Sequence, residues 1–174
     1  MDLTLVQREN SILGQDFLTW LWFASEKRQG LFKTAKGQSF ALHMEHKVSV
    51  QGGEGESLET ASVTSPRGEL AEAKTGLRTG KKVSKAQLRL EIDQDAWQVT
   101  LKADDFGLSG LKTPKVDLRD QEDEDPDSKF LEKLYLVEKC VEMLDSVYAE
   151  FLKARLAKDW PKTAQLMGQW VSQD

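Results

Sequence analysis

Apolar and polar residues alternate in several segments of the chain, which is the pattern of a β-strand with one covered face. The clearest example is residues 40–50, where every second residue is apolar apart from His46. The same pattern predicts further strands at 58–64, 83–92, 97–102 and 108–112. Short turns between neighbouring segments favour antiparallel pairing. We therefore expect an antiparallel sheet of about five strands with one face open to water.

Two segments before the basic centre of the chain have helical patterns instead. Residues 13–27 are apolar on nearly every side, so this helix is expected to be buried or to contact a partner with a second face. Residues 68–79 are expected to form a short helix that Gly80 caps. The aromatic residues of the first helix are Phe17, Trp20, Trp22 and Phe23. Their density suits a core helix or an interface.

A long helix is predicted from Pro126 to about Lys158, because Asp125 can cap it and proline suits its first position. Its apolar residues follow alternating spacings of four and three, which is the heptad pattern. These residues are Phe130, Leu134, Val137, Val141, Leu144, Tyr148 and Phe151. The pattern predicts that this face packs on the sheet or on a partner chain. A short helix follows the break at residues 159–161.

The elements together predict the α+β class. The sheet is expected to pack with the N-terminal aromatic helix, the short helix and the long C-terminal helix. A length of 174 residues fits one domain, or one domain with a helical appendage. The predicted organisation is an α+β domain over residues 1–119, an acidic linker at 120–127 and a helical segment at 128–174.

Composition narrows the protein class. No stretch approaches the roughly 18 apolar residues of a membrane span. The first residues lack the basic and apolar regions of a signal peptide. The single cysteine, Cys140, cannot form an internal disulfide. These features predict a protein of the reducing cytoplasm with no membrane partner.

Motifs for catalysis are absent from the sequence: there is no GxxxxGK[ST], no GxGxxG after a strand, no HExxH and no GxSxG. His43 and His46 have opposite parity in their strand, and Cys140 lies among apolar helical positions. We therefore expect a non-enzymatic protein without metal, cofactor or small-molecule substrate. A metal-dependent nuclease is a remote alternative, because carboxylates gather at residues 104–105 and 120–127.

Charge is unevenly distributed along the chain, whose net charge is −5. Residues 120–174 contain seven basic and thirteen acidic residues, whereas residues 74–102 contain seven basic and three acidic, a local charge of +4. The local field decides where a polyanion binds. The candidate DNA-binding residues are Lys74, Arg78, Lys81, Lys82, Lys85, Arg89, Lys102, Lys112 and Lys115.

The positions of the basic strand residues indicate which part of a nucleic acid they contact. Lys85, Arg89 and Lys102 share the polar parity of two neighbouring strands, so they are expected on the outer face of the sheet. No aromatic residues alternate with them, which disfavours base stacking on single strands. Contacts to phosphates without base reading are the natural form. A solvated sheet face of mixed charge is the alternative.

Several short motifs follow one another in and around this basic centre. They are Gly80-Lys81-Lys82-Val83, Lys85-Ala86-Gln87-Leu88-Arg89-Leu90, Trp97, Gly107-Leu108-Ser109-Gly110-Leu111-Lys112 and Leu118-Arg119-Asp120-Gln121. An acidic run and a long apolar helix follow them. In this order, and together with residues 14–23, they resemble the C-terminal part of the recombination-associated RdgC family.

This resemblance implies an α+β protein without catalytic activity. Family members bind DNA, mainly duplex, without sequence specificity, form a ring-shaped dimer around it, and restrain the RecA recombinase by occupying its DNA. The basic positions that carry over are Lys81, Lys82, Lys85, Arg89 and Lys112. Family members are nearly twice as long, and their N-terminal half has no counterpart in this sequence.

The sequence therefore predicts a nucleoid-associated DNA-binding protein that modulates recombination, acting as a homodimer or with a partner protein. Duplex DNA is the expected ligand rather than single strands. The alternative is a protein-interaction or oligomerisation module that pairs with a chain supplying the missing half.

Overall fold

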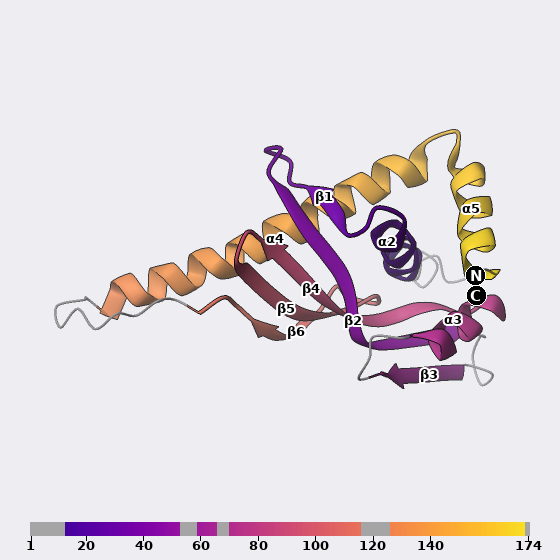
Figure 1. The fold of residues 1–174 in the computed structure, drawn as a ribbon, viewed down its shortest axis with the longest axis horizontal. Coiled ribbons are helices and arrows are strands. Elements are labelled where there is room, and N and C mark those ends of the chain that lie inside the picture. The colour runs from indigo at the N-terminus through magenta and orange to yellow at the C-terminus, as the bar shows by residue number, and fades with distance from the viewer. Residues whose placement is uncertain (1–12, 53–58, 66–69, 116–125, 173–174) are drawn as a thin grey trace, which may run out of the picture.

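The computed structural model describes residues 13–52, 59–65, 70–115 and 126–172 (Figure 1). In chain order the elements are α2 (Gly14–Lys27), β1 (Leu31–Lys33), β2 (Ser39–Gly52), β3 (Glu59–Thr64), α3 (Ala71–Arg78), β4 (Lys82–Ile92), β5 (Asp95–Lys102), β6 (Leu108–Lys112), α4 (Pro126–Leu156) and α5 (Trp160–Ser172). The predicted α+β class is confirmed. Most of the predicted acidic linker, at 120–125, lies outside the described residues.

Six strands form one antiparallel sheet, with the order β1-β2-β4-β5-β6. The strands β1 and β3 both pair with the edge of β2 that is opposite to β4, one near each end of that long strand. The pattern of the sequence predicted about five strands. It missed β1, because the three residues Leu31–Lys33 are too few to show an alternation.

The long strand β2 is interrupted by an irregularity in its pairing with β4. Between Met44 and Val48 the register shifts, so that β2 contains two more residues than β4. Two extra residues preserve the alternation, and Val48 and Val50 therefore still face the covered side. His46, which the alternation placed with the inward-facing residues, lies in the shift and is exposed. Local loss of ladder pairing explains this difference.

One face of the sheet carries the core. The helices α2 and α3 pack on the central strands there, and α4 lies alongside them (Figure 1). Fully buried side chains from both layers include Trp22, Phe17, Phe151, Leu42, Leu88 and Leu90. On the opposite face, none of the described residues of β2, β4 and β5 is buried. This open face is available to a ligand.

The helix α4 is 31 residues long, about 46 Å at 1.5 Å per residue. It begins at Pro126, as the capping pattern predicted. Its first turns extend past the ends of the strands (Figure 1), and Leu136 is its first buried residue. The indole nitrogen of Trp97 donates a hydrogen bond of 2.9 Å to the carbonyl oxygen of Leu136. This bond and the buried Cys140 hold the middle of α4 on the sheet.

Candidate nucleic-acid interface

Two rows of residues cross the open face of the sheet, and the pairing register of the strands creates both. In the first row, Lys85 of β4 lies directly opposite Lys102 of β5, with Ser49 of β2 on its other side. In the second row, Arg89 lies opposite Gln98, which in turn lies opposite Lys112 of β6. The register therefore gathers four of the nine predicted basic residues on one surface, which we call the basic face: Lys85, Arg89, Lys102 and Lys112.

Uncharged polar residues fill the space between these rows. Gln87 pairs with Thr100, and Thr100 pairs with Ser109 on β6. The side chains of Gln87 and Thr100 are half-buried, whereas Ser109 is exposed. Amide and hydroxyl groups can donate hydrogen bonds to phosphate oxygens. Sequence reasoning did not identify these residues as part of the site, because their alignment depends on the strand register.

Charge on the basic face is only partly neutralised by neighbouring acids. Arg89 pairs with Glu91 at 2.6 Å and lies 3.9 Å from Glu45. Lys85, Lys102 and Lys112 have no acidic partner within 4.0 Å among the described residues. Because Lys85 and Lys102 are directly opposed, two like charges are held side by side. An anion that binds between them relieves this repulsion.

Lys74 lies away from the basic face. Its ammonium group donates a hydrogen bond of 2.9 Å to Glu26 and lies 5.0 Å from the ring centre of Trp170. Glu26 also accepts hydrogen bonds from the indole nitrogens of Trp22, at 2.8 Å, and Trp170, at 2.6 Å. A single carboxylate thus ties together α2, α3 and α5.

Arg78 takes part in the same corner of the structure. Its Nε donates a hydrogen bond of 2.8 Å to the carbonyl oxygen of Val171, near the end of α5. Side chains that satisfy the last carbonyls of a helix stabilise its C-terminus. We therefore assign Lys74 and Arg78 to the attachment of α5 rather than to the basic face.

Two of the remaining predicted residues, Lys81 and Lys82, are also separate from the basic face. Lys81 pairs with Glu59 at the start of β3, and Lys82 pairs with Asp16 in the first turn of α2. Lys81 lowers the pKa of the Glu59 carboxyl through a hydrogen bond and its charge. Lys115 is exposed and lies three residues beyond β6. Lys81 and Lys82 therefore lie beside carboxylates that compete with any phosphate.

The predicted interface residues also divide into two groups. Phe17, Trp20, Trp22 and Phe23 are all buried inside this chain, so the interface interpretation of the aromatic helix is replaced by the core interpretation. On α4, Leu144 and Phe151 are buried and Tyr148 is partly buried, whereas the earlier residues of the heptad pattern are exposed. These exposed residues are Phe130, Leu134, Val137 and Val141.

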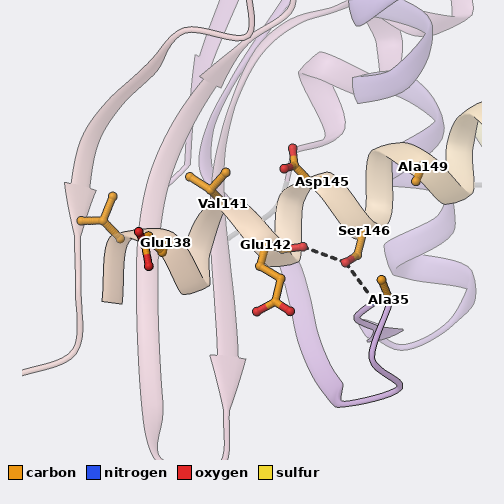
Figure 2. Close-up of a pocket in the computed structure, with 8 residues that line it drawn as sticks. Ala35, Glu138, Val141, Glu142, Asp145, Ser146 and Ala149 are labelled. Atoms are coloured by element: carbon orange, nitrogen blue, oxygen red, sulfur yellow. Dashed lines mark hydrogen bonds between the residues drawn. The ribbon is translucent and has the colours of Figure 1, made fainter. Parts of the chain in front are cut away.

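A shallow hollow lies on the outer side of α4, beside the turn between β1 and β2 (Figure 2). The hydroxyl of Ser146 accepts a hydrogen bond of 3.1 Å from the backbone nitrogen of Ala35 and donates one of 2.7 Å to the carbonyl oxygen of Glu142. Glu138 and Asp145 also line this hollow. Three carboxylates make it unsuited to a polyanion, so it is not an extension of the basic face.

Two other candidates for chemistry are Cys140 and the acids at residues 104–105. Burial raises the pKa of the Cys140 thiol to about 11, so the thiol is protonated at neutral pH and a weak nucleophile. Asp105 accepts a hydrogen bond of 2.7 Å from the backbone nitrogen of Gly107, which is a turn contact. Within the described ranges, no three potential metal ligands cluster, and none of the helices there is long and apolar enough to cross a membrane.

No family model, curated protein or solved structure matches the chain. The RdgC-like resemblance therefore depends on the short motifs alone. Of the basic positions that these motifs carry, the structure gathers Lys85, Arg89 and Lys112 on the basic face. Lys81 and Lys82 pair with acidic residues instead.

Proposed function

We propose that the chain binds duplex DNA through the basic face, by phosphate contacts that do not read the base sequence. The observation that carries the proposal is the gathering of Lys85, Lys102 and Lys112 on an uncovered sheet surface, with no acidic partner within 4.0 Å among the described residues. Basic residues of this kind release condensed counterions when they neutralise phosphates, which favours binding.

The geometry of the rows supports a duplex as the ligand. Lys85 and Arg89 are four residues apart on one strand, a distance of about 13 Å. The open width of the major groove of B-DNA is about 12 Å, so two rows at this spacing can each approach the phosphates on one border of the groove. No Phe, Tyr or Trp occupies the outer face of β2, β4 or β5, so the described surface has no platform for stacking unpaired bases.

We infer a role in recombination from the RdgC-like motifs. A protein that occupies duplex DNA without sequence preference limits the DNA available to a recombinase. The chain as a whole carries a net charge of −5, so long-range attraction is weak and binding depends on the basic face itself. Such binding is strong only at low salt.

The test is a charge reversal of the basic face, Lys85→Glu with Lys102→Glu and Lys112→Glu, followed by fluorescence anisotropy with a labelled duplex at several salt concentrations. We expect loss of binding in this variant. For single reversals, the slope of log K against log salt should become shallower by about 0.9 for each phosphate contact that is lost. A labelled single strand of equal length should bind more weakly than the duplex.

A matched control carries the same change in net charge at the C-terminal helices: Lys153→Glu, Lys158→Glu and Lys162→Glu. Lys153 lies on α4, Lys158 in the connection between α4 and α5, and Lys162 on α5, all outside the open face. The control should retain DNA binding. Equal loss in the two variants would show that only net charge matters, and equal retention would reject the basic face as the site.

A second candidate, a protein-interaction module, is favoured by the exposed apolar residues of α4. Phe130 and Leu134 have exposed fractions of 65% and 42% on a helix that extends beyond the sheet. Large exposed apolar groups of this kind mark contact surfaces. This surface lies on α4 and does not involve the basic face, so the two functions are compatible in one molecule.

A further inference from the structure

The heptad row of α4 has two halves with different surroundings. Its C-terminal half is covered: the ring of Phe17 lies 5.1 Å from the ring of Tyr148 and 5.4 Å from that of Phe151. Its N-terminal half, which we call the exposed row, consists of Phe130, Leu134, Val137 and Val141. The heptad row is therefore covered within the chain only after about residue 141 and is exposed before it.

The exposed row is held in a fixed direction. Leu136 and Cys140 are buried against the sheet, and the hydrogen bond from Trp97 to Leu136 prevents α4 from rotating about its axis. The exposed row is therefore on the flank of the helix and cannot turn inward. A preformed apolar helix face that needs no rearrangement binds a second helix at low entropic cost.

We propose that the exposed row pairs with the exposed row of a second copy of this chain, with the two α4 helices antiparallel. The spacings between its four residues are four, three and four, and this sequence of spacings reads the same in both directions. A two-fold axis between Leu134 and Val137 therefore superimposes the row on itself. It places Phe130 opposite Val141 of the second copy, and Leu134 opposite Val137 of the second copy.

Residue size supports this pairing. The two larger residues, Phe130 and Leu134, lie at one end of the exposed row, and the two valines lie at the other. Antiparallel pairing sets each large side chain against a small one, which fills the space between the helices evenly. Parallel pairing would set phenylalanine against phenylalanine and valine against valine.

An apolar hollow lies where Phe130 of the second copy would arrive. Val141 lines it together with apolar and aromatic side chains and one carboxylate, and its volume is about 160 Å³. These residues include Phe106, Leu108, Leu144 and Tyr148, and the carboxylate is that of Asp145. Leu108 is 41% exposed at the mouth of this hollow. An aromatic side chain that enters it buries the apolar edge of β6 along with the helix, as aromatic anchors do at the centre of stable interfaces.

Side chains of the same chain block the parallel orientation. Beyond Val141, the space beside the heptad row is occupied by Phe17 of α2 and by Phe106, whose ring lies 4.8 Å from that of Tyr148. A parallel second helix would run into these side chains. An antiparallel helix ends near residue 145. The folded body of the second copy then lies beside the first turns of α4, which extend past the strands in this chain (Figure 1).

The charge of this half of α4 opposes self-association only weakly, although Val137 and Val141 border the hollow that Glu138, Glu142 and Asp145 line. Residues 127–142 contain four acidic and three basic residues, so this half of α4 is nearly neutral although the whole chain carries −5. Lys133 and Glu138 lie on opposite flanks of the exposed row. In an antiparallel pair each flank faces its own equivalent, and at this register Glu138 lies beside Leu131 of the second copy rather than beside another acid.

The first test is the mass of the full chain in solution, measured by analytical ultracentrifugation at micromolar concentrations. We expect a dimer of twice 19.7 kDa. Phe130→Glu with Leu134→Glu should give the monomer with an unchanged circular dichroism spectrum, because both side chains are exposed. The control Leu156→Glu, at an 81% exposed leucine outside the row, should stay dimeric. A monomeric wild type, or a double variant that stays dimeric, overturns the proposal.

The orientation is tested by oxidative cross-linking. Phe130→Cys and Val141→Cys variants should each form little disulfide alone, because equal positions are about 16 Å apart in an antiparallel pair. The two variants mixed should form a disulfide-linked heterodimer. Cross-linking of either variant with itself would indicate a parallel pair and reject the proposal. A monomer in which another segment of the same chain covers the exposed row would also reject the proposal.

Discussion

Two groups of basic residues, only a few positions apart in the sequence, have opposite roles in the folded chain. Lys74 is enclosed by Glu26 and by the rings of Trp22 and Trp170, so its charge stabilises the attachment of α5. Lys85 lies on the open face, directly opposite the like charge of Lys102. The comparison shows that the position of acidic and aromatic neighbours, rather than the density of lysines, decides whether a positive charge is available to a ligand.

The largest effect on stability is expected where Lys74 and Glu26 contact Trp170 of α5. Trp170→Ala removes the ring contacts with Trp22 and Phe23 and the hydrogen bond to Glu26. We expect the free energy of unfolding to fall by about 2–3 kcal/mol, at or just below the lower limit of the range for buried aromatic truncations, because Trp170 is only partly buried. Urea denaturation measures this, and DNA binding in the absence of urea should be unchanged. An unchanged denaturation midpoint would contradict the structural role of this corner.

Substitutions of intermediate effect distinguish Lys74, in the enclosed group, from Lys85 on the basic face. Lys74→Met should lower the free energy of unfolding by about 1 kcal/mol, since the ion pair and the cation–π contacts are lost, and should leave DNA affinity unaltered. Lys85→Met should do the reverse, with stability within about 0.5 kcal/mol of wild type and weaker DNA binding. Thermal denaturation and anisotropy on both variants check this. If both variants lose DNA affinity equally, the distinction between the groups fails.

The smallest effect concerns the repulsion between Lys85 and Lys102. Lys102→Glu converts a pair of like charges into a pair of opposite charges at directly facing positions. We expect a gain in stability of about 0.5 kcal/mol at low salt, which disappears at high salt because the pair is exposed to solvent. Denaturation at two salt concentrations measures it. A gain that is independent of salt would have to come from packing, and no gain would mean that the opposed lysines do not interact.

Much of the fold could be predicted from the alternation of residues. The strands β4 and β5, the helix α2 and the start of α4 lie within one or two residues of their predicted ends. The parity of Lys85, Arg89 and Lys102 was sufficient to place them on one face. The alignment of Lys112 with Arg89 could not be predicted, because it depends on a register shift between β5 and β6.

Whether the apolar faces of α2 and α4 are buried or form interfaces could be decided only from the tertiary structure. The aromatic residues of α2 suited a core or an interface equally well, and only the positions of α4 and α5 show that they are buried. The heptad row of α4 is continuous in sequence but is covered only from Leu144 onward, because α2 and Phe106 extend no farther along the helix.

The sequence by itself determined the local structure of this protein: the α+β class, the outward parity of the basic strand residues and the apolar row on the last long helix. Those properties depend on side-chain periodicity, which is a property of neighbouring residues. Only the tertiary structure decided which charges are neutralised and which half of the row is covered. Ion pairs such as Lys74 with Glu26 join residues 48 positions apart, and no local pattern encodes a contact at that separation.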